Sequence, residues 1–224
     1  MERPAVIFDM DGVLVDSYRA HYESWRVAAS ELGRDVSEEE FAATFGRTTR
    51  EIIASTWTDA GLDEAGIAAV DARKEEAYRE IIRRDFPAMP GACELLEALK
   101  ADGFLLAIGS SGPPENVAVV IEQLPAERLF DAAITGNDVT RGKPDPQVFL
   151  LAAERLGVPP ARCAVVEDAP QGLAAARAAG MGSIGLVSTG RTRDELAAAD
   201  LLVERLDELD PQRIRRLIAR AGKR

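Results

Sequence analysis

The chain has 224 residues, of which 46% are hydrophobic, 29% charged and 5% aromatic. This composition is typical of a folded globular protein with a sizeable core, and it excludes fibrous, disordered and low-complexity classes. The formal net charge of −11 disfavours nucleic acid and anionic membranes as partners, so we expect neither, and an anionic ligand would have to meet a local positive site.

The chain shows no signal for export or for a membrane span. Cys93 and Cys163 lie far apart, without the CxxC spacing of a zinc site or a disulfide framework. No apolar run reaches the ~18 residues that cross a bilayer, and acidic residues stand where a signal peptide needs its apolar stretch. We therefore expect a cytoplasmic protein. A monomer is a separate expectation. The basic residues from Arg213 to Arg224 are interpreted as solvated charge near a helix C-terminus.

The first predicted element is a buried strand over Ala5–Phe8, which ends at an acidic turn containing glycine. The next stretch carries roughly four helical patterns and no convincing strand. We therefore expect a helical cap over residues 17–87, inserted between core segments 1–16 and 88–224, with prolines and a glycine in residues 86–91 marking the return. Residues at three- and four-residue steps give the first cap helix one apolar face: Tyr18, Tyr22, Trp25 and Ala29.

Strand and helix patterns alternate through the rest of the chain. Further strands are predicted at Phe104–Gly109, Ala132–Thr135, Cys163–Glu167, Ser183–Val187 and Leu201–Val203. Helices are predicted at Ala92–Ala101, Pro114–Gln123, Pro146–Leu156 and Gln171–Ala179, several of them followed by glycine. This alternation predicts an α/β fold, with a Rossmann-like parallel sheet as the core and the helical cap inserted into it.

Polar side chains follow several of the predicted strands. Asp9 and Asp11 come directly after the first strand, and such a pair is costly at the end of a buried strand unless a cation or a reacting group uses it. Ser110 follows the second strand between glycines, Lys143 lies in a turn bounded by proline, and Glu167-Asp168 ends a later strand. Ligands of open parallel sheets bind outside the carboxyl ends of the strands, so these residues are expected to meet there.

The combined set predicts a Mg²⁺ site beside a phosphate cradle. Mg²⁺ usually takes one or two carboxylates, several waters and a phosphate oxygen, which suits Asp9, a carbonyl of Asp11 and Asp168. Each piece alone is common, because acidic and Ser-Gly turns and lone lysines are ordinary surface features. The interpretation depends on four such signals following one another at successive strand ends.

The run 9–13 (Asp-Met-Asp-Gly-Val), together with Ser110, Lys143 and Glu167-Asp168, closely resembles the motifs of the haloacid dehalogenase superfamily of phosphotransferases. The resemblance spans nearly the whole chain. Residues of the expected cap resemble the subgroup that contains β-phosphoglucomutase and related sugar phosphatases: Asp16-Ser17, His21, Trp25 and the loop Gly46-Arg47-Thr48-Thr49-Arg50.

The resemblance implies Mg²⁺-dependent phosphoryl transfer through an aspartyl-phosphate on Asp9. Asp11 would act as general acid and then as general base, which two carboxylates sustain when their surroundings separate their pKa values. Ser110 would donate a hydrogen bond to the transferring phosphoryl group, and Lys143 would neutralise its charge. The implied metal set is Asp9, Asp11, Glu167 and Asp168.

The resemblance also implies residues that bind the small phosphorylated substrate. His21, the only histidine, would contact the substrate, although a packing role is the alternative. Arg50 would bind the non-reacting end of the substrate by a bidentate contact, and Arg47 competes for this role because the loop alignment can slip. Trp25 is interpreted mainly as cap core or pocket wall. Ser111 is the remaining expected contact.

A phosphatase of small phosphorylated sugars or related metabolites is the favoured function. A β-phosphoglucomutase-type mutase is the alternative, but that enzyme has a serine and a lysine that hold a second phosphate where this chain has Gly112 and Pro113. A hydrolytic dehalogenase is a more distant alternative. It would not need Asp11 or the magnesium ligands, so the presence of these residues opposes it. A non-catalytic module that binds phosphorylated metabolites would be favoured by loss of Asp9 or Asp11, and both are present.

Overall fold

The structure, a computed structural model, describes residues 3–124 and 127–222. Contacts divide the chain into two compact units, one formed by Met1–Ser17 with Pro87–Arg224 and the other by Tyr18–Phe86. Within the first unit, the backbone N–H of Asp16 donates to the carbonyl of Pro87 at 2.8 Å. The chain therefore leaves this unit and returns to it at one place.

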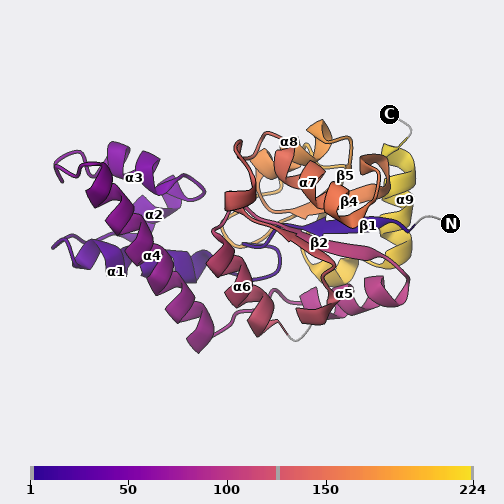
Figure 1. Ribbon diagram of the computed structural model, residues 1–224, viewed down its shortest axis with the longest axis horizontal. Helices are drawn as coiled ribbons and strands as arrows, with labels where there is room; N and C mark the ends of the chain where they lie inside the picture. The colour runs from indigo at the N-terminus through magenta and orange to yellow at the C-terminus, as the bar shows by residue number, and fades with distance from the viewer. Residues whose placement is uncertain (1–2, 125–126, 223–224) are drawn as a thin grey trace. The chain divides into compact units, whose positions relative to one another are not determined.

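The first unit is built on one parallel sheet (Figure 1). Its strands are β1 (Ala5–Phe8), β2 (Leu105–Gly109), β3 (Ala132–Ile134), β4 (Cys163–Glu167), β5 (Gly182–Leu186) and β6 (Leu201–Val203). Their order is β3-β2-β1-β4-β5-β6, and every neighbouring pair is parallel. The predicted α/β fold is confirmed, and β1 lies in the middle of the sheet.

Helices cover both faces of the sheet, which is why its strands are apolar on both sides. They are α5 (Ala92–Ala101), α6 (Pro114–Gln123), α7 (Gln147–Leu156), α8 (Pro170–Ala178) and α9 (Pro211–Ala221), with short 3₁₀ helices at Glu127–Leu129, Gly136–Asp138, Pro160–Arg162 and Leu206–Glu208. Helices α7 and α8 pack in one buried cluster with Ile7 and Val165. Figure 1 shows α5 on the other side of the sheet. Helix α9 packs against β4 and β5.

The predicted strands lie within one residue of the observed ones. Strand β2 begins after Phe104, because the N–H of Phe104 donates to Leu99 and closes the preceding helix. Strand β3 ends before Thr135, whose N–H and hydroxyl both donate to Asp138 in a turn. Strand β5 includes Gly182, which has no side chain to mark the apolar pattern. The predicted start of α7 is one residue early, and α8 lies one residue earlier than predicted.

The second unit is helical, as predicted. It contains α1 (Tyr18–Ser30), α2 (Glu38–Thr44), α3 (Thr49–Thr56) and α4 (Glu64–Arg84). Ser37 and Thr48 begin α2 and α3 with capping boxes, in which each hydroxyl accepts a backbone N–H and a glutamate three residues later reaches back. The apolar face of α1, including Tyr22 and Trp25, is buried in the core of this unit.

Helix α9 carries the basic residues near the end of the chain. Arg215 donates to Asp102 at 2.8 Å, and its guanidinium carbon lies 4.6 Å from the centre of the Phe104 ring. Arg213 donates to the carbonyl of Glu208 at 2.6 Å.

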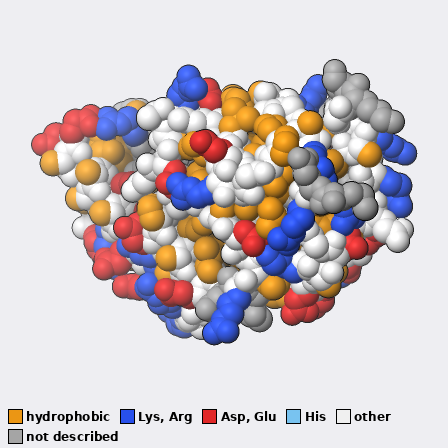
Figure 2. Space-filling model, turned by 45° about the vertical axis from the view of Figure 1, so that its right-hand side comes forward, with side chains coloured by type: hydrophobic (Ala, Val, Ile, Leu, Met, Phe, Trp, Pro, Cys, Tyr) orange, Lys and Arg blue, Asp and Glu red, His pale blue; other side chains and the backbone are white. Residues whose placement is uncertain are grey.

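On the face shown in Figure 2, Lys and Arg side chains are interspersed with Asp and Glu around an apolar area. None of the helices in the described part of the chain has the length and apolar character of a membrane span.

Candidate active site

Functional side chains gather at the carboxyl edge of the sheet. Asp9 follows β1, Ser110 follows β2 and Glu167 is the last residue of β4. Because β1 lies between β2 and β4, these three strand ends are neighbours. The N–H of Asp9 donates to the carbonyl of Val166 at 2.9 Å, which continues the β1–β4 ladder as far as the site. Regular strand pairing therefore positions the start of each functional segment.

Lys143 joins two of these strand ends. Its Nζ lies 2.7 Å from Oδ1 of Asp9 and 2.6 Å from Oε1 of Glu167. The Lys143 side chain is 10% exposed and that of Glu167 is fully buried. The other oxygen of Glu167, Oε2, accepts the backbone N–H groups of Asp168 and Ala169. Every oxygen of Glu167 is thus engaged, which holds Lys143 against Asp9.

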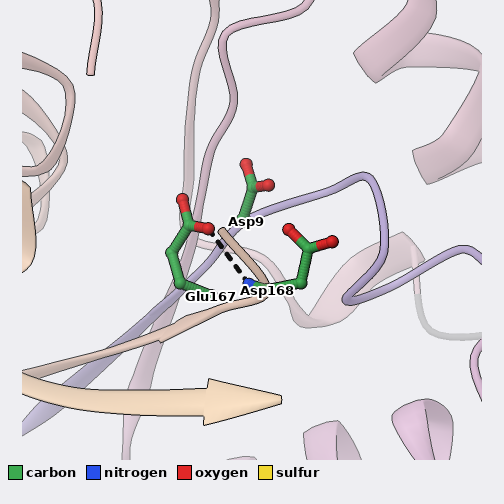
Figure 3. A group of neighbouring side chains, drawn as sticks. All are labelled: Asp9, Glu167 and Asp168. Atoms are coloured by element: carbon green, nitrogen blue, oxygen red, sulfur yellow. Dashed lines mark hydrogen bonds between the residues drawn. The ribbon is translucent and has the colours of Figure 1, made fainter. Parts of the chain in front are cut away.

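Three carboxylates converge beside this lysine. Each of Asp9, Glu167 and Asp168 offers an oxygen that lies within 4.8 Å of those of the other two. Figure 3 shows the three groups gathered at the ends of neighbouring strands, with the bond from the Asp168 N–H to Glu167 drawn as a dashed line. All three residues are buried. The site therefore concentrates negative charge where little water reaches it.

Burial and crowding raise the pKa values of all three carboxyl groups. Burial raises the pKa of Glu167 to about 8 and that of Asp168 to about 6, and the charge of Asp9 adds to both shifts. Burial also raises the pKa of Asp9, although Lys143 opposes the shift. Burial alone would lower the pKa of Lys143, but the charges of Asp9 and Glu167 raise it above its ordinary value.

The donor set fits a hard divalent cation. Three buried carboxylates face the side chains of Lys143 and Arg191, whose Nε lies 3.5 Å from Oδ2 of Asp168. These two cations balance at most two of the three carboxylate charges, and this crowding adds to burial in raising the carboxyl pKa values. Oxygen ligands of this kind are those that Mg²⁺ prefers, and a bound Mg²⁺ would offset the negative charge of the cluster.

Asp11 lies outside the group of three neighbouring carboxylates. It is half-buried in the turn after β1, and its charge contributes to raising the pKa of Asp9. Gly12 follows with φ of 73°, a left-handed conformation that favours glycine. The N–H of Gly12 donates to the carbonyl of Val15 at 2.8 Å and closes the turn. This turn keeps Asp11 close to Asp9 and beside the acidic cluster.

The loop after β2 presents Ser110 with its backbone already hydrogen-bonded. The Ser110 N–H donates to Ile134, and the Ser110 hydroxyl accepts the N–H of Gly112 at 3.0 Å. Gly136 donates to the carbonyl of Gly112 and packs so closely that a Cβ there would lie 2.5 Å from the carbonyl oxygen of Ser111. Ser111 itself is exposed. The end of β3 therefore supports the loop that carries Ser110.

Gly172 in α8 leaves room for the Glu167 carboxylate. A Cβ at this position would lie 1.8 Å from Oε1 of Glu167. Glycine to alanine inside a helix normally stabilises by about 1 kcal/mol, but overpacking a buried site costs about 1–3 kcal/mol. We therefore expect Gly172→Ala to destabilise the protein and to lower activity, because the displaced carboxylate no longer holds Lys143. Urea unfolding and steady-state kinetics measure the two effects.

Gly142→Ala is the matched control for that variant, because a Cβ at Gly142 meets no atom within 4 Å. Its free energy of unfolding should change by less than about 0.5 kcal/mol. Equal stability of the two variants would show that Gly172 is not needed to accommodate Glu167.

The predicted cap residues lie in the second unit. His21 stacks on Tyr78 with ring centres 4.3 Å apart. Trp25 is buried edge-on against Trp57, which agrees with its interpretation as cap core. Arg47 is exposed. Arg50 forms a bidentate ion pair with Glu64 on the surface.

Several residues of interest were absent from the sequence prediction. Oε1 of Gln147 accepts the N–H groups of Thr140 and Arg141 and so holds the loop that leads to Lys143. Ser188 and Arg191 follow β5 and contact Asp168. The same strand-end rule that selected Ser110 could have found these two residues. Lys74 is a buried lysine of α4 beside Glu75, and the sequence carries no signal for it.

Comparisons with known proteins identify relatives of this chain. The family model of haloacid dehalogenase-like hydrolases matches residues 4–180. Protein CbbY of Rhodobacter capsulatus is 34% identical, over 96% of this chain and 98% of its own. A phosphorylated carbohydrates phosphatase of Thermotoga maritima is 33% identical, over 79% and 82%. The crystal structure of β-phosphoglucomutase from Clostridium difficile superposes with a TM-score of 0.86 at 26% identity and covers both chains completely.

The parallel sheet, its acidic edge and these relatives define a phosphoric monoester hydrolase, and the predicted class of enzyme is confirmed. The chain belongs to the haloacid dehalogenase-like hydrolase family, in agreement with the predicted resemblance.

Proposed function

We propose that this protein is a Mg²⁺-dependent phosphatase of small phosphorylated sugars that works through an aspartyl-phosphate on Asp9. The observation that carries the proposal is the contact of Asp9 with Lys143 at 2.7 Å inside the acidic cluster. A buried carboxylate held by one ammonium and crowded by two other acids is suited to attack a phosphate that arrives with a cation. The substrate class follows from the relative whose name states that it is a phosphatase of phosphorylated carbohydrates.

The proposed reaction has two displacements at one phosphorus atom. A carboxylate oxygen of Asp9 bonds to phosphorus while the bond from phosphorus to the ester oxygen breaks, and Asp11 gives that oxygen a proton. A water oxygen then attacks the same phosphorus while Asp11 accepts its proton, and the bond to Asp9 breaks to release phosphate. Ser110 donates a hydrogen bond to the phosphoryl oxygens, and Lys143 balances their charge.

The metal would be held by Asp9, Asp168 and the backbone carbonyl of Asp11, with Glu167 beside them. Bound there, Mg²⁺ would neutralise charge on the transferring phosphoryl group. Glu167 contributes chiefly by holding Lys143, since both of its oxygens are occupied by protein donors. We propose that Arg191 balances charge at Asp168.

Hydrolysis is favoured over mutase activity by the loop after Ser110. A mutase has to hold a second phosphate group while the intermediate reorients. Residues 110–116 contain no lysine or arginine, and Glu115 adds a negative charge to the first turn of α6. A second phosphate would therefore meet repulsion at this loop. We propose water as the acceptor of the phosphoryl group.

A phosphate-release screen with Mg²⁺ over sugar, polyol and small-acid phosphates tests the proposal. We expect turnover of sugar or polyol phosphates. In parallel, β-glucose 1-phosphate with a trace of its 1,6-bisphosphate should yield phosphate, and no more glucose 6-phosphate than the trace of bisphosphate can supply. Formation of glucose 6-phosphate without phosphate release would establish the mutase. Ligand-induced stabilisation without any turnover would favour a non-catalytic binding module.

Arg50 is the proposed contact for a second anionic group of the substrate. Its present partner, Glu64, is a surface carboxylate, and exposed ion pairs are weak enough for a substrate anion to replace them. For Arg50→Ala we expect kcat/KM to fall about 10-fold on substrates with a second anionic group, because a charged hydrogen bond is lost. Simple monophosphates should be unaffected.

The same kinetics on Arg47→Ala distinguish the two candidate arginines. A substrate-dependent loss confined to Arg47→Ala would transfer the role to that residue. An equal loss on all substrates with Arg50→Ala would contradict a role in binding the second anion. Glu64→Gln should retain full activity, because this change removes only the surface ion pair with Arg50 and leaves Arg50 able to bind the substrate.

A further inference from the structure

The loop after β5 contacts one of the proposed metal ligands with two side chains. The Ser188 hydroxyl donates to Oδ2 of Asp168 at 3.0 Å, and Nε of Arg191 lies 3.5 Å from the same oxygen. Backbone bonds hold the loop, because the N–H of Ser188 donates to Leu186 and that of Arg191 donates to Ser188. The contacts to Asp168 therefore come from an ordered turn.

A third group closes the same side of the carboxylate. A Cβ at Gly12 would lie 2.2 Å from Oδ2 of Asp168 and 3.0 Å from the hydroxyl of Ser188. The backbone of Gly12 therefore approaches Oδ2 closely. Ser188, Arg191 and Gly12 come from two different loops, yet all of them meet this one oxygen. The two oxygens of Asp168 therefore differ: among the described residues, these three contacts are all made to Oδ2.

The difference between the two oxygens limits how Asp168 can bind a cation. A carboxylate whose Oδ2 is hydrogen-bonded, paired with a cation and covered by backbone offers only Oδ1 to a metal. Mg²⁺ requires near-octahedral geometry and keeps several waters, whereas Ca²⁺ accepts six to eight oxygen ligands and often takes both oxygens of one carboxylate. A carboxylate restricted to one oxygen therefore suits the smaller ion.

We propose that Ser188 and Arg191 are positioning residues that restrict Asp168 to binding through Oδ1 and thereby favour Mg²⁺ over Ca²⁺. The inference rests on the proposed function only in taking Asp168 as a metal ligand. Ser188 acts by fixing the carboxylate rotation, and Arg191 acts by holding a positive charge against Oδ2. Hydrogen-bonded partners of ligating carboxylates orient those ligands and tune metal affinity.

Isothermal titration calorimetry with Mg²⁺ and with Ca²⁺ on the purified full chain tests the proposal. In Ser188→Ala, Asp168 loses its orienting donor, so we expect Mg²⁺ affinity to fall about 10-fold while Ca²⁺ affinity holds or rises. The ratio of Mg²⁺ affinity to Ca²⁺ affinity should thus fall by about 10-fold or more. Ser188→Thr keeps the hydroxyl and should restore the preference of the wild type.

Arg191→Gln is the second variant, and it keeps the proposal testable if Ser188→Ala fails to fold. Removing this charge should tighten binding of both cations, with Ca²⁺ gaining more. Thr189→Val is the matched control in the same loop, because its hydroxyl donates to Asp16 at 3.0 Å and not to Asp168. Its ratio of Mg²⁺ to Ca²⁺ affinity should equal that of the wild type.

The outcomes separate this proposal from the proposed function. If the wild type binds Mg²⁺ and both loop variants keep its ratio of Mg²⁺ to Ca²⁺ affinity, the role of the loop is refuted and the metal site stands. If Thr189→Val changes the ratio of Mg²⁺ to Ca²⁺ affinity as much as the other variants do, the change reflects general disruption of the loop. That result would also refute the role of Ser188 and Arg191. If the wild type binds neither ion, the metal site itself is refuted, and the role of the loop with it.

Discussion

Asp9→Asn is expected to fold like the wild type and to lose phosphatase activity by roughly 10⁴-fold or more, a typical cost of removing a nucleophile. Asparagine has nearly the same shape, but its amide does not attack phosphorus. Folding should survive because Lys143 keeps its 2.6 Å contact with Glu167 when the charge of Asp9 is removed. Phosphate release under saturating Mg²⁺ measures the activity, and circular dichroism with thermal unfolding measures the fold.

Asp102→Asn is the matched control for this experiment. Asp102 is an exposed aspartate that pairs with Arg215 on the surface, away from the acidic cluster. It should retain full activity. Phosphatase activity that persists in Asp9→Asn at more than about a tenth of the wild-type rate would overturn the assignment of the nucleophile, since general electrostatic help from the site does not replace a covalent step.

The edge of the sheet that carries the site was predictable, because the carboxyl ends of parallel strands all lie at the same edge. Apolar runs that end in Asp9, Ser110 and Glu167 have to deliver those residues to one side once the strands pair in parallel. Lys143 lies in a loop rather than at a strand end, so its position in the chain order indicated its neighbourhood, and the resemblance to a family gave its role beside Asp9. The pattern of residue types alone did not indicate that Lys143 pairs with Glu167 as well as with Asp9.

Other features depend on packing that one sequence does not encode in any local pattern. Gly172 looks like an unfavourable helix residue until the Glu167 carboxylate is seen beside it. Likewise, the pairing of Arg50 with Glu64 joins residues 14 positions apart on two helices. Contacts of this kind arise only when whole elements pack, so spacing along the chain does not reveal them.

Removal of divalent metal is the second prediction with a large effect. Treatment with EDTA should reduce phosphate release to background, and added Mg²⁺ should restore it. The physical reason is charge: without a divalent cation, only Lys143 and Arg191 offset the negative charge of the acidic cluster and of the incoming phosphate. Hydrolysis that is unaffected by EDTA would refute the metal assignment while leaving the nucleophile to be judged by Asp9→Asn.

The same cluster predicts how metal binding depends on pH. In the metal-free protein, the pKa of Asp168 rises from 3.8 to about 6 and that of Glu167 from 4.5 to about 8, mainly through burial. The folded protein thus holds protons that the unfolded chain releases. Their contribution to stability is complete below the unfolded values and is lost as pH rises through about 6 and about 8. The melting temperature of the metal-free protein should therefore fall between pH 5 and pH 8.5.

Mg²⁺ competes with those protons, so it should bind more tightly and stabilise more at pH 8 than at pH 5.5. Thermal unfolding with and without saturating Mg²⁺ across this range measures the effect. Asp168→Asn is the discriminating variant, because it removes one of the titrating groups and a proposed ligand together. Its stabilisation by Mg²⁺ should be small at every pH. A wild-type stabilisation that is independent of pH would mean that the metal binds without displacing protons from Glu167 and Asp168, and hence at another place on the protein.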